Sequence, residues 1–541
     1  MHARRRIGVR APWPGLSLMT LMLLVGLRAS AQGSVQDEDS RETLPVAAEI
    51  RDSSIARTAT DDFPLPLLAH WNTGLRPDGF DPGFQLEQLK RGRFLLPWFA
   101  LAPPDATGAG RIDERYYTKT VSLLADSRLP ISFVSTQWDV VVARYLCKDT
   151  QAKAPPAEAG QACKGSPQPL SPLSSKDIWY QAGLAWAQQP ALKLLQRLYP
   201  DPPLVLFVSN NEQPKVRPTS GAGDVAGQRA VGDAWIERYQ LLQRGFRDGL
   251  ERQEWKDRSR FIGYNAFGPS YLGRWPGWRD YSLYIPGRAD PWPLALDGAS
   301  VSYYVNDWNE GTDYTVRSPQ IEAMNWIPMI AQVRLAKPDF WLEMSVWDGQ
   351  RIGNPKDKAA FYRSQGQDYD ERRYAGMVQF GMWLLRPRVV REFRDHLATR
   401  QQFGDYFDEL TKAVERVHDD KLLRRFWQHG RLVRNIAESH PYQAGVPADF
   451  GDARWFLLKA SANPPRPWEL KTPLAVYALA LELGEPGTRE WLIYAFAPLG
   501  DFDKTQVAMP GGTTVNIRAT RNGCFFHVAE NDADGSAVGA C

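Results

Sequence analysis

Between residues 61 and 400 the chain alternates between short apolar runs and longer segments of mixed polarity. Eight runs of six to nine residues have the length and the aromatic or β-branched content of buried strands. Parallel strands need long connections between them, so this alternation predicts a parallel sheet. The runs are Leu65–Asn72, Arg93–Phe99, Ile131–Trp138, Leu204–Glu212, Phe261–Phe267, Ser300–Val305, Phe340–Val346 and Val378–Leu385.

Several of the segments between these runs carry apolar residues at helical spacing. They are Ile178–Leu198, Val231–Arg252 and Ile321–Leu335, and a helix over Arg388–Thr399 is expected after the eighth run. Eight strands with helical crossovers predict an α/β protein with a (β/α)₈ TIM barrel over residues 61–400. Pro97 is an awkward residue for a central strand. The irregular segment 268–298 is expected to be a long binding loop.

After the barrel the pattern changes twice. Residues 401–450 are charged and mainly helical, which predicts a connector. From residue 451 strand-like runs return, separated by Pro, Gly and Asn-Gly turns, and these predict an appended all-β sandwich over residues 451–541.

The N-terminus has the order of a secretory signal peptide. Arginines between Arg4 and Arg10 precede an apolar stretch of 12 residues, Leu16–Leu27, and a small-residue site that predicts cleavage after Ala31. An uncleaved signal anchor is the alternative. Residues 32–60 are polar and aperiodic and predict a flexible leader. No later apolar stretch is long enough to cross a bilayer, so we expect a secreted or periplasmic protein that leaves the membrane after signal cleavage.

The four cysteines fit an oxidising compartment. Cys147 and Cys163 bracket a polar insert and are expected to pair, and Cys524 with Cys541 would form a second disulfide, with free thiols as the alternative. Neither the cysteines nor the seven histidines have metal-ligand spacing, so no metal and no cofactor is expected.

Composition narrows the class of partner. Without the first 31 residues, 60 basic residues face 62 acidic ones, a net charge near −2, which argues against nucleic acid or an anionic membrane as partner. Aromatic residues make up 12% of the chain, more than a core alone needs, and we expect many of them to line a groove.

Two glutamates stand where strands of such a barrel carry catalytic groups. Glu212 ends the fourth run, directly after Asn211. Glu343 lies in the seventh run among apolar and aromatic residues, where a carboxylate needs a reason to be present. The alternatives are that Glu212 caps a helix or pairs with a cation, and that Glu343 pairs with a buried Arg or Lys.

This arrangement resembles the retaining glycoside hydrolases of the large (β/α)₈ clan, which carry Asn-Glu at the end of strand four and Glu on strand seven. The resemblance covers roughly Leu65–Thr399. It implies that Glu212 is the general acid/base, that Glu343 is the nucleophile, and that Asn211 binds the sugar 2-hydroxyl. It further implies a hydroxyl from Tyr303 or Tyr304 beside Glu343 and an aromatic platform at Trp383. Asn309-Glu310 is a second, lower-ranked Asn-Glu pair.

Other polar and aromatic residues at strand ends suit sugar recognition, since rings stack on sugar faces and amides bind hydroxyl groups. Each could equally be a core residue. They are His70, Trp71, Asn72, Gln137, Trp138, Asn265, Trp308 and Trp347.

The sequence therefore predicts an exported retaining glycoside hydrolase that acts on a poly- or oligosaccharide. Two alternatives stay open. One is a catalytically inactive carbohydrate-binding protein of the same fold, and the other is a transglycosylase that uses the same glutamates.

Overall fold

The computed structural model describes residues 63–70, 90–95, 99–100, 114–135, 176–209, 240–267, 297–304, 341–345, 371–393, 404–433, 457–462, 474–530 and 536–539, with single positions 87, 237, 238, 532 and 541. The predicted signal peptide and the predicted leader, residues 1–60, lie outside these ranges, as do Cys147 and Cys163. The expected helix 321–335 and loop 268–298 lie outside them as well, apart from residues 297 and 298.

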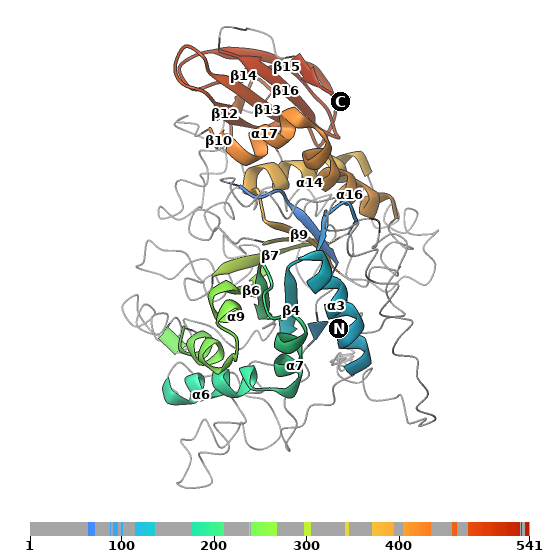
Figure 1. Cartoon of the computed structure of the whole chain (residues 1–541). Coiled ribbons are helices and arrows are strands. Elements are labelled where there is room, and N and C mark those ends of the chain that lie inside the picture. The colour runs from blue at the N-terminus through green and yellow to red at the C-terminus, as the bar shows by residue number, and fades with distance from the viewer. Residues whose placement is uncertain are drawn as a thin grey trace, which may run out of the picture. The chain divides into compact units, whose positions relative to one another are not determined.

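The first half of the described chain forms a nine-stranded sheet in which every pair of neighbours is parallel (Figure 1). Its spatial order is β2-β1-β9-β8-β7-β6-β5-β4-β3, so β3 to β9 follow chain order and β1 pairs with β9. The strands are β1 (Leu67–His70), β2 (Phe94–Leu95), β3 (Phe99–Ala100), β4 (Ile131–Ser135), β5 (Val205–Ser209), β6 (Ser259–Phe267), β7 (Gly298–Tyr304), β8 (Trp341–Ser345) and β9 (Val389–Phe393).

The two ends of this sheet are consecutive in the chain. β2 pairs with β1 at one end and β3 pairs with β4 at the other, and only residues 96–98 separate them. Pro97 lies in that gap, outside the described residues, and the second predicted run contains β2 and the first residue of β3.

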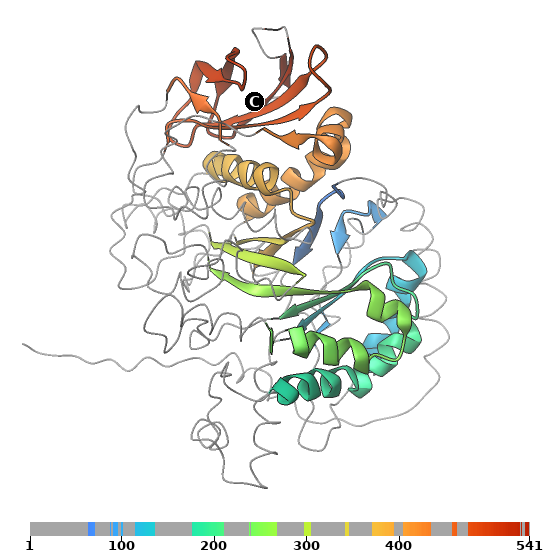
Figure 2. The same ribbon diagram turned by 90° about the vertical axis from the view of Figure 1, so that its left-hand side faces the viewer.

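The helices α3 (Glu114–Ser127), α6 (Lys176–Ala187), α7 (Pro190–Leu198) and α9 (Gln253–Arg258) connect these strands, and residues 240–249 are helical too (Figure 2). The single helix expected over Ile178–Leu198 is two helices, because Pro190 begins the second one at its first turn.

The eighth predicted strand is wrong. Residues of the run Val378–Leu385 form the second half of helix α14 (Glu371–Leu385), and the strand that pairs with β1 and β8 is β9. The helix expected over Arg388–Thr399 is therefore wrong in its first part. The side chains from Arg373 to Leu385 are all buried, and a helix that is apolar all round cannot be told from a buried strand by its pattern.

The C-terminal part forms two antiparallel sheets, here called the C-terminal sheets. The first contains β10 (Arg431–Leu432), β12 (Tyr477–Leu483), β13 (Glu490–Phe496), β16 (Cys524–Ala529) and β17 (Ser536–Val538). The second contains β11 (Lys459–Ala460), β14 (Phe502–Ala508) and β15 (Thr514–Ala519). The first strand of this part starts at Arg431, upstream of the boundary at 451 expected from the sequence. Cys524 and Cys541 form a disulfide, the second pair that the sequence predicts.

One apolar core lies between the two C-terminal sheets. It takes alternate residues of their strands, among them Ala480, Ile493, Val507, Ile517 and Phe526, each less than 5% exposed. Alternation along a strand sends the intervening residues of the five-stranded sheet to its other face.

That other face is also buried, because the helices α14 and α17 (Lys421–His429) lie next to it, and α16 (Gly404–Asp419) packs against both of these helices (Figure 1). Phe380 packs edge-on against Tyr477, and Trp383 packs against Phe525, with ring centroids 5.5 and 5.1 Å apart. The hydroxyl of Tyr494 donates to the Gly376 carbonyl at 2.9 Å. Helix α14 also contacts β8, and α16 contacts β1, so these helices join the parallel sheet to the C-terminal sheets.

Candidate active site

Glu343 is the middle residue of β8, a strand with neighbours on both sides. The ladder pairs it with Ser302 on β7 and with Arg391 on β9, and Arg391 pairs in turn with Ala69 on β1. These four positions form one register row across four strands. The predicted nucleophile thus occupies an interior position of the parallel sheet rather than an edge.

The register also shows which predicted residues share a sheet face with Glu343. His70 belongs to the next row, with Glu392 and Met344, and successive rows lie on opposite faces of a sheet. The backbone therefore does not bring position 70 to the face of Glu343. Tyr304 pairs with Ser345, two rows from Ser302 and Glu343, and so shares their face. The register favours Tyr304 over Tyr303 as the tyrosine near the predicted nucleophile.

Asn265 lies on β6 within the irregular stretch between Gly263 and Ala266, where the pairing with β7 shifts register. It has no register partner there, so the ladder assigns it to neither face.

Most of the other predicted residues lie outside the described residues. For several of them the described strands fix how far along the chain they follow a carboxyl end: Glu212 comes three residues after the end of β5, Gln137 two after β4, and Trp347 two after β8. Trp71 directly follows β1. The predicted residues outside the description are Glu212, Asn211, Trp71, Asn72, Gln137, Trp138, Trp308 and Trp347, together with the rival Glu310.

Trp383 is not at a strand end, and this corrects the expectation of a sugar platform on strand eight. It lies on α14 with none of its surface exposed. Trp427 and Phe525 pack edge-on against it, each at 5.1 Å between ring centroids, and its indole N–H donates to the Gln379 side chain at 3.2 Å. Its ring faces are occupied by protein, so we assign it to the core.

Polar contacts are described at the amino-terminal ends of two parallel strands, β7 and β1. The carboxylate of Asp297, next to the start of β7, accepts from the Phe261 N–H at 2.8 Å and from Arg247 at 2.7 Å. Pro66, at the start of β1, accepts a hydrogen bond from the His418 ring at 2.7 Å. These contacts therefore join elements at the amino-terminal ends of parallel strands.

Sequence reasoning missed Arg391. The sequence pattern predicts a helix over Arg388–Thr399 and therefore does not place Arg391 on a strand beside Glu343. No local signal marks it as a neighbour of Glu343. Two adjacent β-branched residues, Val389 and Val390, are the one local sign that this segment is a strand.

Comparison with models of known protein families gives no match, and comparison with curated proteins gives none either. Among the residues that the structure describes, no group of three or more His, Cys, Asp or Glu side chains could hold a metal ion. No helix in the described part of the chain is long and apolar enough to cross a membrane.

Proposed function

We propose that this chain is an exported retaining glycoside hydrolase that cleaves a poly- or oligosaccharide by double displacement. Glu343 is the nucleophile and Glu212 the general acid/base. The observation that carries the proposal is the position of Glu343, a carboxylate at the centre of β8 inside an all-parallel sheet. A carboxylate at an interior strand position is unusual, and we assign its charge to chemistry.

The order of the strands supports a closed barrel as the scaffold. β2 and β3 stand at opposite ends of the sheet, yet the chain from Leu95 to Phe99 can span at most about 14 Å. A flat sheet of nine strands would hold its outer strands roughly 38 Å apart. A sheet whose two ends approach each other would satisfy this short connection, and we propose that β2 and β3 are two halves of one strand that closes an eight-stranded barrel.

With β2 and β3 counted as one strand, Glu212 follows the fourth strand and Glu343 lies on the seventh. In the proposed first step Glu343 attacks the anomeric carbon while Glu212 gives its proton to the departing oxygen. In the second step Glu212 removes a proton from water, which displaces Glu343 from the sugar. Two inversions retain the anomeric configuration, and this chemistry needs the carboxyl groups about 5–5.5 Å apart.

Replacing Glu343 tests the proposal. Glu343→Ala should lower turnover of an activated aryl glycoside by several orders of magnitude while the far-UV circular dichroism spectrum stays that of the wild type. Added azide should partly restore cleavage and give a glycosyl azide of inverted configuration, because the small anion occupies the space of the lost carboxylate.

Glu254→Ala is the matched control, since Glu254 is an exposed glutamate in the first turn of α9. It should leave activity unchanged. The substrates are a panel of 2,4-dinitrophenyl glycosides of both anomeric configurations together with natural polysaccharides. Near-wild-type activity of Glu343→Ala would remove Glu343 from the mechanism, and a wild-type protein inert on the whole panel would defeat the proposed function.

A further inference from the structure

Two opposite charges are register neighbours in the interior of the parallel sheet. Arg391 on β9 pairs with Glu343 on β8, and the row continues through Ala69 on β1 to Leu95 on β2 and through Ser302 on β7 to Phe267 on β6. β9 lies between β1 and β8, so Arg391 has a strand on each side. Both charged positions therefore stand where a parallel sheet ordinarily carries apolar residues.

Two described side chains share the face of this row: Ala69 belongs to it, and Val389 lies two residues before Arg391 on β9. Both are no more than 1% exposed. A guanidinium in such a strand needs a counter-charge, since burying an unpaired ion costs several kcal/mol. Ala69 offers none, and Glu343 is the charged position in the same row. Neighbouring strands are about 4.8 Å apart, which is within the range of a strong charge pair.

Glu392 of β9 and the two arginines of α14 have register positions or partners of their own. Glu392 is its chain neighbour, but it belongs to the row of His70 and thus to the opposite face. Helix α14, which contacts β8, carries Arg372 and Arg373, and these bind Asp501 and the Pro498 carbonyl at 3.0 and 2.9 Å. On the face of Glu343, the described positions of β7 and β9 with titratable groups are Tyr304 and Arg391.

We propose that Arg391 is a positioning residue that keeps Glu343 ionised and oriented for attack. The proposal rests on the proposed function and deepens it, since a nucleophilic carboxylate must carry its negative charge when substrate arrives. A cation within about 4–6 Å typically lowers the pKa of a carboxylic acid by about 1–3 units. Arg391 would thus hold the enzyme active toward lower pH than Glu343 alone could.

The kinetic test uses Arg391→Met, Arg391→Lys and a 2,4-dinitrophenyl glycoside that the wild type cleaves. This leaving group needs no proton, so the acid limb of the kcat/KM profile reports the ionisation of the nucleophile. We expect the acid limb of Arg391→Met to move up by at least about one pH unit, which lowers kcat/KM about tenfold on that limb. Arg391→Lys should restore most of the shift. Arg260→Met, a strand arginine whose register partner is Leu206, is the matched control and should not move the limb.

The outcomes separate the two proposals. An active enzyme whose Arg391→Met variant keeps the wild-type acid limb overturns the role of Arg391 and leaves the proposed function standing. A wild-type protein that cleaves no glycoside of the panel defeats the function, and the positioning role falls with it.

A second measurement needs no activity and covers the case in which Arg391→Met folds poorly. Urea unfolding at pH 7 is compared for wild type, Glu343→Gln, Arg391→Met and the double variant. If the two charges pair, the double variant is more stable than Arg391→Met alone, because it no longer holds an unpaired carboxylate. Strictly additive losses, or a double variant less stable than Arg391→Met, overturn the pairing.

Discussion

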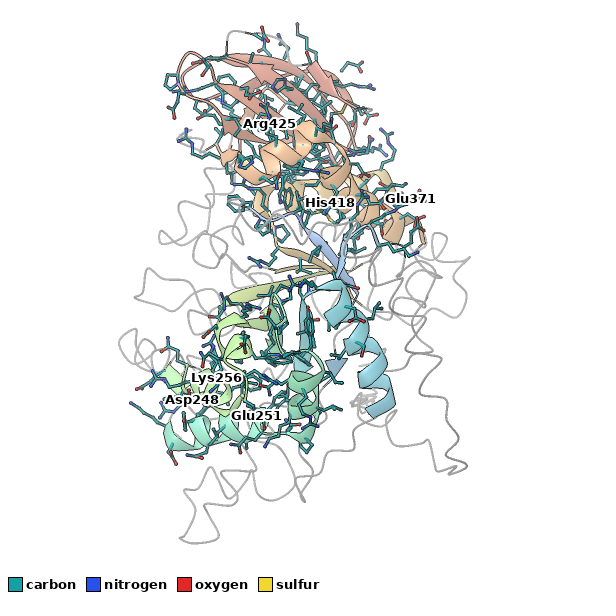
Figure 3. The ribbon with its side chains drawn as sticks, viewed as in Figure 1. Asp248, Glu251, Lys256, Glu371, His418 and Arg425 are labelled. Carbon is teal, nitrogen blue, oxygen red and sulfur yellow. A yellow bond between two sulfur atoms is a disulfide. The ribbon has the colours of Figure 1, made fainter. Side chains whose placement is uncertain are left out.

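His418 is a buried base that the fold keeps neutral. It lies on α16 with 1% of its surface exposed, and it binds the Pro66 carbonyl just before β1 (Figure 3). Burial lowers the pKa of His418 to about 4, and the nearby Arg93 and Arg424 act in the same direction, while the Pro66 hydrogen bond and Asp419 oppose them. Since the imidazole must be neutral to stay there, its Nε2 carries the proton that Pro66 accepts.

Acid should therefore weaken the contact between α16 and β1. The unfolded chain binds a proton at His418 below about pH 6.5, whereas the folded chain does so only below about 4. Stability is thus lost as the pH falls from 6.5 to 4, by up to about 3 kcal/mol from this group. His418→Gln keeps an N–H donor and cannot titrate, so its free energy of unfolding should fall less over that range. Urea unfolding at several pH values checks this, and equal slopes for both proteins would contradict it.

Substrates that differ in the acidity of their leaving group test the proposed role of Glu212. Glu212→Ala should cut cleavage of natural glycosides by about 10²–10⁴-fold, because their leaving oxygen needs a proton. On 2,4-dinitrophenyl glycosides the first step should persist and the second should stall, which gives a burst of phenol in stopped-flow measurements. Equal losses on both substrates without a burst would transfer the role to Glu310 or defeat the retaining mechanism.

At the scale of elements, the sequence pattern and the structure disagree at helix α14, where the pattern predicts a strand. The other seven apolar runs each contain strand residues, because a buried strand in a parallel sheet is a short, continuous apolar stretch. The run Val378–Leu385 has the same appearance for a different reason, since α14 is enclosed by β8 on one side and the C-terminal sheets on the other. Enclosure is a tertiary property, and no local spacing encodes it.

The candidate site likewise contains one residue that the sequence indicates and one that only the strand register shows. Glu343 could be proposed from the sequence because a lone carboxylate in an apolar run stands out. Its neighbour Arg391 could not, because their pairing depends on the register of two strands 48 residues apart. Local chemistry is readable in the sequence, but the assembly of strands determines which groups share a face.

Close packing of α14 makes a specific prediction at Gly376. A Cβ there would lie 2.1 Å from the Phe496 ring and 2.4 Å from the Arg521 carbonyl. Gly376→Ala should therefore destabilise the protein by a few kcal/mol, although alanine is the better helix former by about 1 kcal/mol. Thermal unfolding measures the loss. Gly500→Ala, where an added Cβ meets nothing within 4 Å, should be close to neutral, and equal effects at both positions would contradict the packing argument.

For the whole molecule, the C-terminal sheets are part of the fold rather than a detachable module. Removing them would uncover the faces of α14 and α17 that bury Trp383, Phe380 and Phe426, at on the order of 2–3 kcal/mol for each large side chain. Because stabilities of whole domains are only about 5–15 kcal/mol, the remainder should not stay folded.

A chain that ends at residue 433 tests this statement. It should be insoluble or lack cooperative unfolding, while the chain that retains residues 434–541 should unfold with the parallel sheet and the C-terminal sheets in a single calorimetric transition. A truncated protein that is soluble, cooperative and as active as the full chain would make the C-terminal sheets an independent module after all.

The pairing of β1 with β9 has a consequence for the order in which the protein can fold. Leu67 and Val389 are 322 residues apart in the chain, yet they are neighbours in the sheet. Bringing together ends of so long a loop carries a large entropic cost, and contacts of this separation slow folding. β1 can pair with β2 early in folding, but it has no second neighbour until the segment that begins at Val389 joins the sheet. The first strand made thus waits for the last, and a nascent chain halted before β9 can hold no complete form of this sheet.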